Sequence, residues 1–403
     1  MNKRMYRARR LLVTVAVLLL AFASSAGAEE RIRDARGKNG MVASAHPLAS
    51  QVGVDILKAG GNAVDAAVAV GFALGVVEPN ASGIGGGGLM LIWLADSGRT
   101  VFIDFREKAP TGAAADMFEL DEEGSIKPDD RGFNPAVVGG RSVAVPGEVA
   151  GLLLAQQKFG SMARAQVMQP AIGLAEQGIT VSEVLAGLIA ENYDVLLGYP
   201  ESSAIYLSDD FPKSPGETVR NTDLAATLRL VAEQGRDGFY TGRVAQSIVN
   251  AVQADGGSIT MEDLAGYLPS YRAPVRGQYR GYDIVSSPPP SSGGAHVIEL
   301  LNIMEHYDLA AMGPDSADSL HAWGEAMKLA YADRAVFMGD SDFVLVPTEE
   351  LASKAYAKKR FELIDMDTAM PEYGAGDPTA GDSGSTTHYS VIDAAGNMVA
   401  CTK

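Results

Sequence analysis

Cysteine is almost absent from this sequence: Cys401 is the single one among 403 residues. One cysteine excludes a disulfide within the chain, so a packed core has to supply the stability. Cys401 lies at an alternating position of an apolar stretch. That position is typical of a buried structural thiol rather than of a nucleophile.

Positive charge is also scarce, since 33 Lys and Arg face 50 Asp and Glu and give a formal net charge of -17. This balance argues against a nucleic acid partner. It accommodates a small cationic or zwitterionic substrate more readily. Histidines are few and scattered, at positions 46, 296, 306, 321 and 388. The sequence has no HExxH motif, no Cys-His cluster and no phosphate-binding GxxxxGK[ST] loop, so we expect neither a metal nor a cofactor.

Long hydrophobic runs are missing, and the apolar run 11–23 has 13 residues, too few for an ordinary membrane span. Five positive charges precede it in residues 1–10, and small residues up to Ala28 follow it. This order predicts a secretory signal peptide over residues 1–28, with cleavage after Ala28. We therefore expect a bacterial periplasmic or secreted protein without a membrane span in its mature form.

The whole sequence is 47% hydrophobic, and the part after residue 28 has the patterns of a globular α+β protein. Apolar spacing predicts a helix over 47–59, and Asn62 precedes an apolar helix that is expected to be buried. Two strands are predicted within 89–105, joined by a turn at 96–98. Further helical spacing covers 148–178, 220–235, 242–255 and 316–338, and strand pairs are expected over 276–287 and 389–402.

Two motifs have an ordinary structural interpretation. Residues Gly83–Gly88 match the letters GxGxxG, but a helix precedes them and a strand follows, which is the reverse of a dinucleotide-binding unit. We expect these glycines to let backbone approach backbone, or to leave room beside a site. The segment Ser287–Gly294, SPPPSSGG, is interpreted as a rigid linker that caps the following helix.

Arg106 ends the apolar hairpin in the stretch DFREKAP. An arginine at a strand end is usually a surface residue. The functional alternative is that its planar guanidinium binds a substrate carboxylate through two parallel hydrogen bonds.

A change of pattern at Thr386 suggests a catalytic role. The segment 366–385 lacks hydrophobic periodicity and is expected to be an exposed, mobile loop. A strand hairpin follows at once. A loop that ends at a hydroxyl residue before a strand suits an N-terminal nucleophile, whose freed α-amine acts as base for its own hydroxyl.

Several motifs together resemble the γ-glutamyltransferase family, also called glutathione hydrolase. They are GMVASAHPLASQVGVDILKAGGNAVDAAVAV, GIGGGGLMLI, DFREKAP, SSPPPSSGG, EAMKLAYADR and TTHYSVID. The resemblance implies an N-terminal-nucleophile hydrolase fold of stacked α, β, β and α layers. It also implies a proenzyme that cleaves itself before a threonine into a large and a small subunit.

By this resemblance Thr386 is the nucleophile, the cleaved bond is Ser385–Thr386, and Arg106 holds the α-carboxylate of a γ-glutamyl group. The implied substrates are glutathione and other γ-glutamyl compounds, with water, amino acids or dipeptides as acceptors and no cofactor. Residues 29–385 correspond to the large subunit and 386–403 to the start of the small one. The family's small subunit is far longer than these 18 residues, so we expect a truncated proenzyme with an incomplete αββα sandwich that is inactive by itself.

Two other functions stay open at this level. A related acylase that acts on cephalosporin or glutaryl side chains shares the nucleophile and differs in the acyl group. A non-catalytic γ-glutamyl peptide binder is the alternative outside the enzymes.

Overall fold

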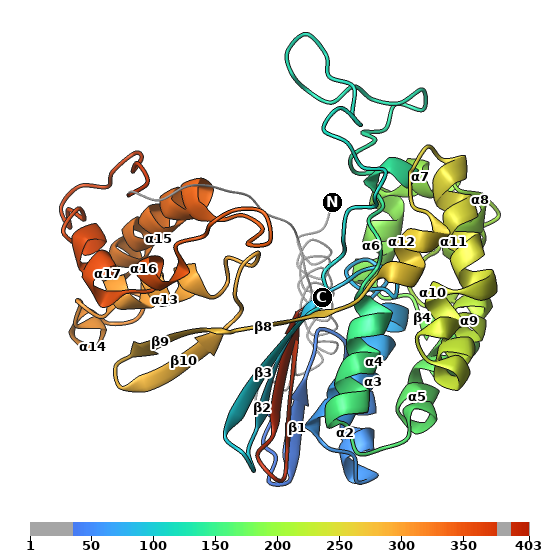
Figure 1. The fold of residues 1–403 in the computed structure, drawn as a ribbon, viewed down its shortest axis with the longest axis horizontal. Helices are drawn as coiled ribbons and strands as arrows, with labels where there is room; N and C mark the ends of the chain where they lie inside the picture. Colours follow the sequence, from blue (N-terminus) through green and yellow to red (C-terminus); the bar gives the residue numbers. More distant parts are fainter. Residues whose placement is uncertain (1–34, 377–387, 403) are drawn as a thin grey trace, which may run out of the picture. The chain divides into compact units, whose positions relative to one another are not determined.

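The structure is a computed structural model that describes residues 35–376 and 388–402. Its contacts group the chain into a unit of residues Met1–Lys38, most of which lie outside the described ranges, and a unit of residues Asn39–Lys403. Every helix and strand named below belongs to the second unit (Figure 1). Within the described ranges, no helix is long and apolar enough to cross a membrane.

The largest sheet has six antiparallel strands. In spatial order they are β1 (Gly40–Ala43), β11 (His388–Asp393), β12 (Met398–Thr402), β2 (Leu89–Leu94), β3 (Arg99–Asp104) and β8 (Ser270–Arg272). Alternate side chains such as Met90 and Ile92 are buried, and this face contacts helix α3 (Ala63–Val77). On the other face, Met41, Trp93 and Met398 are exposed and line an apolar cavity of about 560 Å³.

Helix α3 is buried along all 15 of its residues, as expected from its apolar sequence. Its first turn carries a capping box. The Asn62 side chain accepts hydrogen bonds from the N–H groups of Val64 and Asp65 at 3.0 Å, and Asp65 accepts from the Asn62 N–H at 3.1 Å. Asp65 also accepts from the N–H and hydroxyl of Ser161, at 2.9 and 2.7 Å. These bonds satisfy N–H groups that a helix leaves without partners.

The hairpin of β11 and β12 is attached to this helix start. Oδ2 of Asp393 accepts from the N–H of Ala63 at 3.0 Å and from the Asn397 amide at 2.7 Å. The Asn397 side chain in turn accepts from the N–H of Ala95, in the turn between β2 and β3, at 3.0 Å. A carboxylate at a helix N-terminus is also favoured by the helix dipole.

Helices from the middle of the chain pack beside α3 and on one another (Figure 1). They are α4 (Glu148–Phe159), α5 (Arg164–Gln177), α6 (Glu183–Glu191), α7 (Tyr193–Leu197), α8 (Pro200–Tyr206), α9 (Thr222–Gln234), α10 (Asp237–Tyr240), α11 (Gly242–Ala254) and α12 (Met261–Gly266), with a 3-10 turn η1 (Gly140–Ser142). Two small ladders pair β4 (Ile179–Thr180) with β7 (Thr218–Val219) and β5 (Leu207–Ser208) with β6 (Phe211–Pro212).

Further along the chain, the hairpin of β9 (Val275–Tyr279) and β10 (Tyr282–Ser286) contacts helix α13 (Ala295–Met304). Helix α13 packs on three later helices, α15 (Ala317–Phe337), α16 (Thr348–Leu351) and α17 (Lys354–Phe361). The short helix α14 (Leu309–Met312) contacts α15.

Most predicted elements are confirmed, including the α+β class. The helical stretch 148–178 is divided, because α4 ends at Phe159 and α5 begins at Arg164. Residues 366–376, the described part of the expected loop, form no helix or strand but are held in place. Arg360 donates to the Gly374 carbonyl at 3.0 Å, and the Gly376 N–H donates to Asp333 at 2.6 Å.

Asp333 belongs to a buried polar cluster between α13, α15 and α17. It forms an ion pair with Arg360 at 2.9 Å, while Nδ1 of His296 lies 2.7 Å from Oε2 of Glu299. Burial, and then the neighbouring Asp333, raise the pKa of Glu299 well above its usual range, and burial lowers the pKa of His296. This shift favours the protonated form of Glu299 in the folded protein.

The raised pKa of Glu299 predicts the effect of Glu299→Gln. A carboxyl that stays protonated only when folded stabilises the protein below its ordinary pKa and loses that contribution as pH rises. Glutamine is neutral in both states, so the variant should gain Tm relative to wild type between pH 5 and pH 8. Thermal unfolding at both pH values measures this, with the exposed Glu362→Gln as control. A difference between variant and wild type that does not grow with pH would contradict the assignment.

Candidate functional site

Arg106 follows the end of β3 and is fixed through its backbone. Its N–H donates to Oδ1 of Asp104 at 3.0 Å, and its carbonyl accepts from the Tyr267 hydroxyl at 2.7 Å. Burial raises the pKa of Tyr267, so this hydroxyl stays protonated. The Arg106 side chain is exposed, and among the described residues its guanidinium has no hydrogen-bond or ion-pair partner. It is therefore available to an anion.

The glycines of residues 83–88 bring backbone up to backbone beside Arg106. The N–H groups and carbonyls of Gly88 and Phe105 are hydrogen bonded to each other at 2.8 and 3.2 Å. A Cβ on Gly87 would lie only 2.5 Å from the Phe105 carbonyl oxygen and 2.7 Å from the Glu107 nitrogen. The expected close approach of backbone to backbone is confirmed at Gly87, whereas a Cβ on Gly83 or Gly85 would meet nothing within 4 Å.

A cavity of about 610 Å³ lies at Arg106. Strands, the segment before α13 and helix α15 contribute its lining residues: Leu89, Leu91, Phe102, Arg106, Val285, Ser286, Ser287, Pro290, Ser291, Ser292, Gly293, Arg334, His388, Ala400 and Thr402. A second cavity, of about 620 Å³, shares Arg106, Pro290, Ser292 and Arg334 with the first. It is bounded on its other side by Asp342 and Phe343.

His388 is the first described residue of β11 and brings a second chemically active side chain to the cavity. Its Nδ1 lies 2.8 Å from the Thr402 hydroxyl and its Nε2 lies 3.1 Å from the Ser390 hydroxyl. Burial lowers the pKa of His388, which favours the neutral imidazole at neutral pH. Ser385 and Thr386, like Ala28, lie outside the described residues, so the structure does not test their roles.

The interpretation of Ser287–Gly294 as a linker with a cap is incomplete. Gly294 occupies the N-cap of α13, and no side chain caps the helix. Ser292 instead accepts from Nε of Arg334 at 3.0 Å and lines both cavities. The segment is therefore part of the cavity wall. The sequence signal that could have indicated this was its place among the family motifs.

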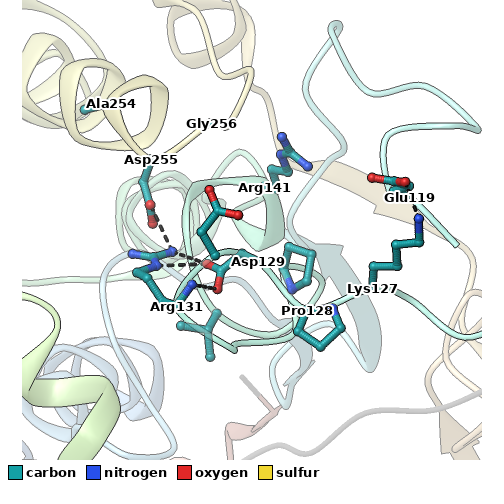
Figure 2. Close-up of a pocket in the computed structure, with 12 residues that line it drawn as sticks. Glu119, Lys127, Pro128, Asp129, Arg131, Arg141, Ala254, Asp255 and Gly256 are labelled. Atoms are coloured by element: carbon teal, nitrogen blue, oxygen red, sulfur yellow. Dashed lines mark hydrogen bonds and ion pairs between the residues drawn. The ribbon is translucent and has the colours of Figure 1, made fainter. Parts of the chain in front are cut away.

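Another cavity, of about 540 Å³, lies beside α11 and is polar (Figure 2). In Figure 2, Arg131 points at Asp129 and Asp255, with which it forms ion pairs at 2.7 and 3.0 Å. Tyr199 also donates to Asp255, at 2.7 Å. These groups are hydrogen bonded to one another, whereas the Arg106 guanidinium has no such partner in the described part of the chain. Within the described ranges, no cluster of three or more His, Cys, Asp or Glu side chains could hold a metal ion.

Known proteins are similar to this chain in sequence and in fold. A family model for gamma-glutamyltranspeptidase matches residues 49–403. The "Glutathione hydrolase proenzyme" of Escherichia coli K12 is 47% identical over 382 residues, which is 94% of this chain and 65% of that protein. The "Acylase ACY 1 proenzyme" of Pseudomonas sp. SE83 is 45% identical over 92% of this chain and 66% of that protein.

Among solved structures, Helicobacter pylori gamma-glutamyltranspeptidase superimposes with a TM-score of 0.79 at 45% identity. The match covers 84% of this chain and 95% of that chain. The sequence thus spans about two thirds of the length of the two curated relatives.

Proposed function

The chain belongs to the gamma-glutamyltranspeptidase family, and from this premise we propose that it takes part in γ-glutamyl transfer from glutathione and other γ-glutamyl compounds. Water would receive the γ-glutamyl group in hydrolysis, and amino acids or dipeptides would receive it in transpeptidation. The observation that carries the proposal is the shared cavity of Arg106 and His388. In this cavity the guanidinium of Arg106, which has no ion-pair partner among the described residues, lies with His388, the first described residue of the strand that follows Thr386.

Arg106 is suited to hold the α-carboxylate of the γ-glutamyl group. A guanidinium offers two parallel N–H donors to a carboxylate, and the backbone of Arg106 is fixed by Asp104 and Tyr267. Little conformational freedom of its backbone is then lost on binding.

Thr386 is the proposed nucleophile. It precedes His388 by two residues, so the Cα atoms of the two lie within about 7.6 Å of each other in any conformation. Its hydroxyl attacks the carbonyl of Ser385, the peptide C–N bond breaks, and water hydrolyses the ester that forms. The reaction leaves Thr386 with a free α-amine, whose ordinary pKa of about 7.7–8.0 suits a base near neutral pH.

Turnover follows the same chemistry. The Thr386 Oγ attacks the γ-carbonyl of the substrate and gives up its proton to the α-amine, and the amine of the leaving dipeptide receives that proton. Water or an acceptor amine then attacks the γ-glutamyl ester and releases Thr386. The large and small subunits of the enzyme would come from one precursor, with residues 29–385 in the large one.

An acylase of the kind acting on cephalosporin or glutaryl side chains is the second candidate, favoured by the 45% identity to an acylase proenzyme. The two functions differ in the acyl group. Both groups carry a terminal carboxylate, but a γ-glutamyl group also carries an α-amine that a glutaryl group lacks. Turnover of γ-glutamyl-p-nitroanilide without turnover of glutaryl-p-nitroanilide supports the first candidate, and the reverse supports the second.

Replacement of Arg106 tests the proposed substrate. In enzyme expressed from its complete gene, Arg106→Ala should raise KM for γ-glutamyl-p-nitroanilide strongly, because a charge-assisted contact of about 1.5–3 kcal/mol is lost. Arg106→Lys should recover part of it, since a point charge lacks the planar fork. Steady-state kinetics measure both. Wild-type kcat/KM in Arg106→Ala would contradict the role.

Replacement of Thr386 tests processing and turnover together. Thr386→Ala should give an uncleaved, inactive precursor, because no hydroxyl remains to accept an acyl group. Thr386→Ser keeps the hydroxyl and loses the methyl group that restricts χ1, so it should be cleaved, and more slowly. Gel electrophoresis and intact mass follow the cleavage. Efficient cutting of the Ala variant before residue 386 would indicate an external protease.

Export is proposed from the N-terminal sequence, with a periplasmic or secreted mature protein. Removal of residues 1–28 leaves Glu29 as the first residue. N-terminal sequencing of protein recovered from the periplasm or the medium measures this directly. A mature protein that keeps the apolar run 11–23 would overturn the proposed localisation.

A further inference from the structure

The Arg106 backbone depends on Asp104, whose two carboxylate oxygens have separate partners. Oδ1 accepts from the Arg106 N–H at 3.0 Å, and Oδ2 accepts from Nε of Arg272 at 2.5 Å. The Asp104 side chain is only 7% exposed, so water solvates its charge poorly. Arg272 is therefore its counter-ion.

Arg272 also connects the sheet edge to the loop after α15. It lies in β8, opposite Phe102 of β3. Its Nη1 and Nη2 donate to the two carboxylate oxygens of Asp342 at 2.7 and 2.8 Å. Three N–H groups of one guanidinium thus bind two carboxylates, which a lysine cannot reproduce. Hydrogen bonding to Arg272 lowers the pKa of Asp342 below its usual range.

The position of Asp104 makes its neutralisation important for Arg106. The two residues are two positions apart and line the same cavity. A carboxylate at 104 without a counter-ion, hydrogen bonded to the Arg106 N–H, would be an anion in the cavity that Arg106 lines and would compete with a substrate carboxylate for its guanidinium. We propose that Arg272 is a positioning residue for γ-glutamyl binding: its ion pair with Asp104 offsets the Asp104 charge, so that the Arg106 guanidinium stays available to the substrate. This inference rests on the proposed function.

A purely structural role for Arg272, as a tie between β8 and the loop, predicts a different result. A loosened structure would change kcat as well as KM, and would affect substrates with and without an α-carboxylate alike. A positioning role acts on the carboxylate contact alone.

The experiment uses enzyme expressed from its complete gene and two substrates. They are γ-glutamyl-p-nitroanilide and 4-aminobutyryl-p-nitroanilide, which is the same compound without the α-carboxylate. Arg272→Met should raise KM for the first roughly tenfold, as expected for the loss of a charge-assisted contact. Its kcat should change by less than about threefold. The kcat/KM for the second substrate should stay at the wild-type value.

A double variant gives the decisive comparison. In Arg272→Met with Asp104→Asn the competing charge is absent, and the Asn oxygen can still accept the Arg106 N–H. KM should return close to the wild-type value. The control is Arg229→Met, because Arg229 pairs with Glu176 on a helix surface that contributes no residue to either cavity at Arg106. This control should match wild type.

Three results would overturn the inference: an unchanged KM in Arg272→Met, equal losses on both substrates, or a double variant without recovery. If Arg272→Met does not accumulate as folded protein, the double variant decides alone, since a tenfold raised KM there contradicts the proposal. A wild-type enzyme without turnover of γ-glutamyl-p-nitroanilide refutes the proposed function and the inference with it. An active wild type with any of the three results refutes the inference only.

Discussion

The complete burial of α3 constrains how the neighbouring helices and the six-stranded sheet pack around it. A 15-residue helix without an exposed face can form only if other elements surround it, and its first N–H groups must still find partners. Asn62 and Asp65 supply some of these partners locally, and Asp393 supplies one from 330 residues further along the chain. Because Asp393 ends β11, the hydrogen bond that completes the helix start also fixes the hairpin that begins beside the candidate nucleophile.

The site at Arg106 combines a fixed backbone with a side chain that has no hydrogen-bond or ion-pair partner among the described residues. Sheet pairing, the close approach at Gly87 and the Tyr267 hydroxyl fix the main chain around it. Near it, Asp104 and Asp342 share Arg272 as their counter-ion. The guanidinium of Arg106 takes no part in these ion pairs. Arg131 differs in this respect, because its guanidinium forms ion pairs with Asp129 and Asp255.

Sequence patterns predicted the elements well where local chemistry decides them. Alternation indicated the β2–β3 and β11–β12 hairpins, and Asn62 indicated the start of α3. The contacts between distant segments were not predictable. Nothing local in Ser287–Gly294 indicates that it lines a cavity with His388, and nothing around Arg272 indicates that it neutralises Asp104. These pairings follow from sheet order and loop path, which a periodicity does not encode.

The strand order has a consequence for the kinetics of folding. Strands β11 and β12 lie between β1 and β2, so the strand pairing of the sheet cannot be completed until the last described segment of the chain has been synthesised. Such non-local pairing is slow to form. Once the bond before Thr386 is cut as proposed, the same two strands belong to a separate polypeptide. Refolding from denaturant then becomes a bimolecular association, so the mature protein depends on slow unfolding to persist.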